Sequence, residues 1–164
     1  MSSYFDESLV FCNLDLNSKE EVIEFMSNKL LEKKRVKKTY PQRVLEREKD
    51  YPTGLEIGDI NVAIPHCDYQ HVNIKSVCIA TLKNPVVFHK MDDPSEEVEV
   101  SIILMLAIDH PNDHLEFLQQ VFSLVQNQKI LKQIKNSSNE SEIIELVKSN
   151  FKGVWNEKYI SSMW

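Results

Sequence analysis

A continuous apolar run from Ile102 to Ile108 constrains the fold more than any other segment of the chain. A strand with one face in water alternates apolar and polar residues, whereas a run that is apolar at every position needs cover on both faces. The run has seven residues, and a helix that crosses a membrane needs about 20. It therefore predicts a central strand, within the segment Val98–Ile108, that lies buried between two layers of helices.

Helical patterns lie before and after this sheet-forming region. Ser18 and Glu21 have the spacing of a capping box, and apolar residues at helical spacing follow them. Thr39 and Gln42 repeat that signature and predict a second helix from about residue 40 to residue 49. The last third of the chain contains further helical segments, which start near residues 112, 129 and 139.

Shorter strands are predicted between the helical regions. Residues 60–64 alternate and are β-branched, and Pro65 ends the strand. Residues 77–82 and 86–89 form two further short strands, and Lys83-Asn84-Pro85 between them predicts a hairpin turn. We therefore expect an α/β fold with a mixed (parallel and antiparallel) central sheet of about five strands, flanked by helices on both sides.

The length and the charge limit the class of protein. The 164 residues are the size of one domain, so we expect residues 1–164 to form a single domain. The net charge of −6 argues against DNA or RNA as a ligand, since nucleic-acid-binding proteins are usually basic. The one basic cluster, Lys33–Lys38, is interpreted as a solvated helix end followed by a loop, and a docking or nucleic-acid role for it stays open.

The cysteines and the N-terminal segment indicate a reducing compartment. Cys12, Cys67 and Cys78 are sparse, odd in number and without the spacing of a metal site, which favours free thiols. Residues 1–16 carry acidic side chains and no basic region, so they do not resemble a secretory signal. We therefore expect a cytoplasmic protein without direct membrane insertion.

The candidate site surrounds His66, which follows the predicted strand at 60–64 and its closing proline. Such strand ends are where α/β proteins hold ligands and catalytic groups. The chain has only 3 glycines, and two of them, Gly54 and Gly58, lie in the loop before this histidine, where they let the backbone approach an anion. A neutral imidazole is also a good nucleophile near pH 7, because its ordinary pKa is about 6.5.

Two other chemistries are open to the same segment. His66, Cys67, Asp68 and His71 are all competent metal ligands, so a zinc site is one alternative. Adjacent His and Cys side chains point apart on an extended chain, however, and one short segment rarely closes a tetrahedral site. Cys67 is also a candidate nucleophile, which requires a neighbouring base and a lowered thiol pKa.

Three motifs in this region carry a resemblance to a known family. They are Leu45-Glu46-Arg47-Glu48, Tyr51-Pro52-Thr53-Gly54-Leu55 and Val62-Ala63-Ile64-Pro65-His66. In this order and spacing they are similar to the enzyme IIA domains of the mannitol–fructose class of the bacterial phosphoenolpyruvate-dependent sugar phosphotransferase system. The resemblance extends over nearly the whole chain, and the continuation Pro65-His66-Cys67-Asp68 looks most similar to the galactitol-type branch.

The resemblance implies a phosphotransferase that works through a phosphohistidine. In the family, the histidine of the Ile-Pro-His motif, here His66, accepts a phosphoryl group from phospho-HPr and passes it to a cysteine of the IIB component. The transfer supports uptake and phosphorylation of a galactitol-like sugar or polyol by the membrane IIC component, an indirect partner. Because donor and acceptor are both protein side chains, no metal or cofactor is implied. A regulatory phosphohistidine module, which binds a regulator according to its phosphorylation state, is the alternative function.

The resemblance also implies two further catalytic residues. Arg47 matches the active-site arginine of the family, and a planar guanidinium suits phosphate oxygens. His114 matches a second active-site histidine. We favour His114 over His110 for this role, because Leu115 and Leu118 follow it as in the family.

Thr53 and Gly54 match the phosphate-binding segment of the family. The Thr53 hydroxyl is a hydrogen-bond donor, and a glycine at position 54 lets the backbone approach the phosphate. Plainer alternatives exist for two of these residues. Arg47 has Glu46 and Glu48 as possible ion-pair partners within its helix, and Thr53 has an ordinary role in a turn.

Overall fold

Five strands form one mixed sheet in the computed structural model, which describes residues 5–110 and 114–163. The strands are β1 (Phe5–Leu14), β2 (Gly54–Leu55), β3 (Val62–Ala63), β4 (Ser76–His89) and β5 (Glu97–Ala107). Their order across the sheet is β1-β4-β5-β3-β2. The β1–β4 and β3–β5 pairs are parallel, and the β4–β5 and β2–β3 pairs are antiparallel. The predicted α/β fold with a mixed sheet is confirmed.

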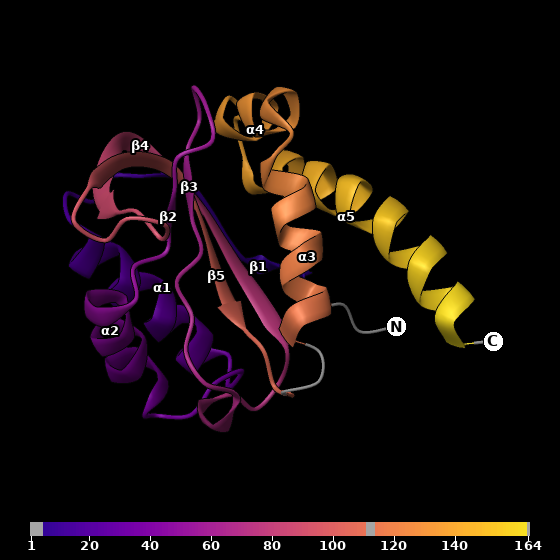
Figure 1. The fold of residues 1–164 in the computed structure, drawn as a ribbon, viewed down its shortest axis with the longest axis horizontal. Coiled ribbons are helices and arrows are strands. Elements are labelled where there is room, and N and C mark those ends of the chain that lie inside the picture. Colours follow the sequence, from indigo (N-terminus) through magenta and orange to yellow (C-terminus); the bar gives the residue numbers. More distant parts are fainter. Residues whose placement is uncertain (1–4, 111–113, 164) are drawn as a thin grey trace.

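Helices cover both faces of this sheet, as Figure 1 shows. They are α1 (Lys19–Glu32), α2 (Tyr40–Asp50), α3 (His114–Val125), α4 (Gln128–Lys135) and α5 (Glu140–Met163), and a short 3-10 turn, η1, covers Tyr69–His71. Helices α1 and α2 lie on one side of the sheet, and α3, α4 and α5 lie on the other. Within the described residues, no helix is both long enough and apolar enough to cross a lipid bilayer.

Strand β5 is the shared wall of two hydrophobic cores, as its apolar sequence predicts. Ile103 and Met105 pack into the core under α1 and α2, whereas Ile102 and Leu104 pack into the core under α3 to α5. All four side chains are at most 3% exposed. A polar residue at any of these positions would lie in one core or the other without water, which explains why the pattern does not alternate.

Strand β1 is the element that the sequence pattern did not predict. Its first residues include Asp6, Glu7 and Ser8, which weaken the strand signal. The strand lies at the edge of the sheet and pairs only with β4, so one of its sides has no neighbouring strand. An edge position tolerates such polar residues, because their backbone groups and side chains remain near water.

The predicted hairpin turn at Lys83-Asn84-Pro85 is wrong, because β4 continues through it. The three residues are exposed, and the pairing register with β5 shifts between Thr81 and Val86. Such an irregularity accommodates Pro85, which has no N–H for the ladder. The turn between β4 and β5 comes later, where the Lys90 amide donates to the Glu96 carbonyl at 2.9 Å.

The two predicted helix caps have different outcomes. The Ser18 hydroxyl accepts from the Glu21 amide at 3.1 Å, so this cap is confirmed, although the Glu21 carboxylate accepts from the Asn17 amide. The Thr39 side chain makes no capping hydrogen bond. Its hydroxyl lies 2.7 Å from Nδ1 of His71, so a long-range contact replaces the predicted local one.

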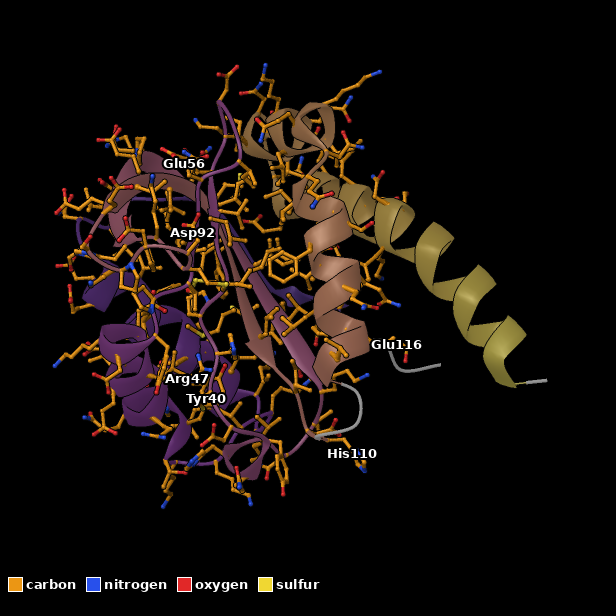
Figure 2. All side chains as sticks on the ribbon, viewed as in Figure 1. Tyr40, Arg47, Glu56, Asp92, His110 and Glu116 are labelled. Carbon is orange, nitrogen blue, oxygen red and sulfur yellow. The ribbon has the colours of Figure 1, made fainter. Side chains whose placement is uncertain are left out.

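Gly54 packs where the loop before β3 meets the β4–β5 hairpin. A Cβ at this position would lie 2.6 Å from the His89 carbonyl oxygen and 2.7 Å from Cγ1 of Val98. The Gly54 carbonyl accepts from the Met91 amide at 2.8 Å, and Nζ of Lys90 binds Glu56 at 2.8 Å nearby. Figure 2 labels Glu56 in this region of the molecule. There is therefore no room for a side chain at position 54.

We predict that Gly54→Ala lowers the free energy of unfolding by about 1–3 kcal/mol, because the new methyl group overlaps a backbone carbonyl that cannot move aside. Urea denaturation measures the change. Asp59→Ala in the same loop is the control, since its ion pair with Lys132 is exposed and contributes little. Equal stabilities for the two variants would contradict the packing argument.

Candidate functional site

His66 lies three residues beyond the short strand β3 with its side chain buried, 6% exposed. Its Nδ1 atom is 2.8 Å from the carbonyl oxygen of Ile64. A carbonyl oxygen only accepts hydrogen bonds, so this contact requires the proton to be on Nδ1. In the neutral ring the lone pair is then on Nε2. The backbone of the same segment thus selects which ring nitrogen carries the proton and which carries the lone pair.

Hydrogen bonds from the central strand hold the backbone on the N-terminal side of His66. The Leu106 amide donates to the Pro65 carbonyl at 3.0 Å, and the buried Tyr40 hydroxyl donates to the Leu106 carbonyl at 2.7 Å. Burial raises the pKa of Tyr40 well above its ordinary value, so this hydroxyl remains a donor. The start of α2 is therefore fixed to the end of β5, and through it to the residue before His66.

Arg47 lies on α2, half-buried, with its guanidinium carbon 5.3 Å from the centre of the Tyr51 ring. Figure 2 labels Tyr40 and Arg47 beside α2, between that helix and the sheet. The positive charge of Arg47 acts on the thiol of Cys67, the residue after His66. The ion pairs that the described residues form do not include Arg47, and Glu46 pairs instead with Arg43 at 3.6 Å. The structure thus places Arg47 close enough to Cys67 for its charge to act on that thiol, and does not place it in the expected intrahelical pair. Its role beside His66 stays a prediction.

Thr53 binds Glu48 in the structure. Its amide and its hydroxyl each donate to the Glu48 carboxylate at 2.8 Å. Both residues are buried, with Glu48 3% and Thr53 1% exposed. The hydroxyl that the sequence assigns to phosphate is therefore directed at a carboxylate. From the sequence alone we considered Glu48 only as an ion-pair partner of Arg47, so the bond to Thr53 was missed. The signal available for Glu48 was its place beside Arg47 in the motif.

Burial raises the pKa of Glu48 to about 7, although the two hydrogen bonds from Thr53 act in the opposite direction. The charges of Lys19 and Arg47 also lower this pKa, with smaller effects than burial. A carboxyl group with this pKa is partly protonated at neutral pH. It is the titrating group that the sequence pattern did not predict at this site.

The two glycines before His66 are required by packing. Gly54 lies against the β4–β5 hairpin, as described above. Gly58 has a φ of +153°, and a Cβ there would lie 2.8 Å from the Gln128 side chain. That side chain binds both the amide and the carbonyl of Ile60. Contact with an anion is therefore not needed to explain either glycine, and the phosphate role of Gly54 stays a prediction.

The two candidates for a second histidine lie between the end of β5 and the first residue of α3. His110 is exposed and lies just beyond β5, as Figure 2 shows. His114 is the first residue of α3, but its side chain lies outside the described part of the chain. The preference for His114 over His110 stays a prediction.

The structure gives Cys67 properties unsuited to a nucleophile. Its side chain is 4% exposed, and burial together with the neighbouring Asp68 raises the pKa of the thiol to about 12. A thiol with this pKa is protonated at neutral pH, and the thiolate is the reactive form. In residues 5–110 and 115–151, no group of three or more His, Cys, Asp or Glu side chains is placed to hold a metal ion.

Comparisons with known proteins agree with the motifs and the fold. Residues 3–150 match the family described as phosphoenolpyruvate-dependent sugar phosphotransferase system, EIIA 2. The galactitol-specific EIIA component of Escherichia coli strain K12 is 31% identical over 113 residues, which are 69% of this chain and 75% of that protein. The transcriptional regulator ManR of Bacillus subtilis is 30% identical over 115 residues, 70% of this chain but 16% of the regulator.

The fold is also similar to that of solved structures. One is the complex of enzyme IIAMTL and phosphorylated enzyme IIBMTL from Escherichia coli. The similarity has a TM-score of 0.73 and 21% sequence identity, and it covers 88% of this chain and 99% of that chain. At this level of identity the similarity establishes the shared fold.

We predict that Glu48 makes the protein less stable as the pH rises from about 4.5 to about 7. Its pKa is higher in the folded protein than in the unfolded chain, so the folded state holds the proton more tightly. The stabilising contribution is complete below pH 4.5 and is lost as the pH rises through 7. It amounts to about 3 kcal/mol, from the size of the shift.

The measurement is the free energy of unfolding of wild type and Glu48→Gln, compared at intervals between pH 4.5 and pH 8. Glutamine has the same shape and does not titrate, so the difference between the two proteins isolates this carboxyl group. We expect the difference to change steadily in favour of Glu48→Gln as the pH rises. A difference that is constant with pH would be inconsistent with a raised pKa.

Proposed function

The chain belongs to the EIIA 2 family of the phosphoenolpyruvate-dependent sugar phosphotransferase system, a family of phosphoryl-transfer proteins, and we propose that His66 carries the phosphoryl group. The observation that supports this residue is the bond between its Nδ1 and the Ile64 carbonyl. That bond leaves Nε2 as the basic nitrogen of a neutral imidazole at the end of a strand. No other residue of the Ile-Pro-His motif has a nucleophilic side chain.

In the proposed reaction, the Nε2 lone pair attacks the phosphorus of phospho-HPr. The Nε2–phosphorus bond forms as the bond to the donor group breaks, and the donor keeps that electron pair. The proton stays on Nδ1, so the ring becomes positively charged, and the Ile64 carbonyl oxygen stabilises this charge. In the second step the IIB cysteine thiolate attacks the same phosphorus, and the ring leaves as neutral imidazole.

Arg47 is the proposed stabiliser of the transferring group. Phosphoryl transfer passes through a loose transition state in which charge spreads over three equatorial oxygens, so the protein contributes mainly positioning and positive charge. A guanidinium offers two parallel donors to such oxygens. Arg47 is half-buried and close enough to Cys67 to act on its thiol, which supports a position beside His66.

Thr53, Gly54 and His114 complete the proposed site. Thr53 and Gly54 adjoin the strand that leads to His66, since the Ile64 amide donates to the Thr53 carbonyl at 3.2 Å. The Thr53 hydroxyl binds phosphate only if it turns away from Glu48. We propose His114 as the second active-site histidine, with His110 as its competitor for that role.

The proposed setting is sugar uptake in the cytoplasm. Residues 1–164 act as one phosphocarrier domain between phospho-HPr and a IIB component, and the membrane IIC component is an indirect partner. The similarity to a galactitol-specific EIIA component supports a galactitol-like sugar or polyol as the transported compound. The solved complex of a similar IIA fold with a phosphorylated IIB protein supports direct contact with IIB.

A regulatory role is the second candidate, and the similarity to ManR favours it. In that case the phosphorylated form of His66 serves as a signal that a regulator reads, and phosphate need not pass to IIB. Incubating the phosphorylated protein with a purified galactitol-type IIB component separates the two functions. Rapid loss of phosphate to a IIB cysteine supports transport, and retention of phosphate supports signalling.

We predict that His66→Gln abolishes phosphorylation by phosphoenolpyruvate, enzyme I and HPr. Glutamine keeps a hydrogen bond donor for the Ile64 carbonyl but has no nucleophilic nitrogen. The measurement is incorporation of acid-labile phosphate in stoichiometric amount. His89→Gln is the matched control, since Nδ1 of His89 also binds a backbone carbonyl, that of Pro94 at 2.9 Å. Full incorporation in His66→Gln would refute the assignment.

We predict that Arg47→Ala slows phosphoryl transfer to His66 by about 100-fold, the typical loss when one stabilising donor of a transition state is removed. The measurement is the single-turnover rate with phospho-HPr. Lys49→Ala, an exposed position on the same helix, is the control for a general loss of positive charge, and its effect is expected to be clearly smaller. Equal effects of the two variants would mean that Arg47 acts only through charge.

A further inference from the structure

Three hydrogen-bonded steps connect the buried carboxylate of Glu48 to the ring of His66. In the first, the Thr53 amide and hydroxyl donate to Glu48, each at 2.8 Å. In the second, the Thr53 carbonyl accepts from the Ile64 amide at 3.2 Å. In the third, the Ile64 carbonyl accepts from Nδ1 of His66 at 2.8 Å. Thr53 and Ile64, the two inner residues of the series, are therefore each held from two sides.

The strands on which the series depends are short. Strand β2 and strand β3 have two residues each, and only the pairs Gly54–Ala63 and Leu55–Val62 connect them. Strand β5 holds the other side of β3, but so short a β2–β3 ladder does not by itself fix the direction of the Thr53 carbonyl next to it. The bonds from Glu48 to Thr53 anchor the outer strand to α2, which leaves the Thr53 carbonyl directed at Ile64.

Burial of a carboxyl group is costly unless hydrogen bonds compensate for the lost water. Glu48 is 3% exposed, and none of the ion pairs among the described residues includes it. Both hydrogen bonds to its carboxylate come from Thr53. An apolar side chain of similar size would fill this space without that cost, so the carboxylate serves an end other than packing.

We propose that Glu48 is a positioning residue that acts through Thr53 and Ile64 to hold the His66 ring in one orientation and one tautomer. It does not touch the phosphoryl group. The kinetic part of this inference rests on the proposed function, since it takes His66 as the phosphate acceptor. The tautomer part concerns the unphosphorylated protein and does not depend on it.

The principal test compares Glu48→Leu with Glu48→Gln. Leucine has a similar volume but cannot bind Thr53, whereas the glutamine amide oxygen accepts from the Thr53 amide and its NH2 group donates to the hydroxyl. Nitrogen-15 NMR of the histidine rings, without any phosphate donor, reports the tautomer. We expect Nδ1–H for His66 in wild type and in Glu48→Gln, and a mixture of the two tautomers in Glu48→Leu.

His89 is the internal control in the same spectra. Its Nδ1 also binds a backbone carbonyl, that of Pro94, and it lies outside the hydrogen-bonded series. Its signals should not change in either variant. In the transfer reaction we expect Glu48→Leu to lower kcat by up to about 100-fold with little change in KM, because the loss is in the alignment of the nucleophile.

A second pair of variants keeps the test decisive if Glu48→Leu does not fold. Thr53→Val removes the hydroxyl donor to Glu48 while keeping the shape, and Thr53→Ser retains the donor. We expect a smaller shift toward mixed tautomers in Thr53→Val and none in Thr53→Ser. A folded Glu48→Leu, or Thr53→Val, with the wild-type His66 tautomer would overturn the proposal. Failure of His66 to accept phosphate would overturn the proposed function and leave the tautomer result standing.

Discussion

The double coverage of β5 is the constraint on which the rest of the structure depends. Its side chains alternate between two cores, so each layer of helices packs against this strand and the strand is buried only when both layers are in place. This position also determines where the neighbouring strands run. Because β3 pairs with β5 in parallel, both strands run in the same direction. The chain therefore leaves β3 at the same end of the sheet as it leaves β5.

The candidate site lies at this end of the sheet, where β3 and β5 both end. The Leu106 amide near the end of β5 binds the Pro65 carbonyl, and the Leu106 carbonyl binds Tyr40 at the start of α2. Helix α2 carries Arg47 and Glu48 further along, so one helix positions both the cation and the buried carboxyl group. The site therefore draws its rigidity from regular elements, although His66 itself lies on an irregular segment.

The features set by strong local patterns were predictable from the sequence. The apolar run identified β5, and the Ser18 cap identified the start of α1. The three motifs around His66 identified the family, whereas the role of His66 stays a prediction. The missed features depend on contacts between distant residues. Strand β1 is recognisable only once β4 is beside it, and the turn signal at residues 83–85 is overridden by pairing with β5. The Thr39 hydroxyl likewise binds His71 because tertiary structure brings the two together.

The partner of Nδ1 in His66 is a carbonyl of the main chain, which every amino acid possesses. The path of the backbone thus determines the orientation of the ring, and the identity of a neighbouring side chain does not. Substitutions at position 64 will alter packing, yet none of them can delete the acceptor. A substitution at position 64 therefore leaves the hydrogen-bond acceptor of the His66 ring in place as long as the path of the chain is unchanged.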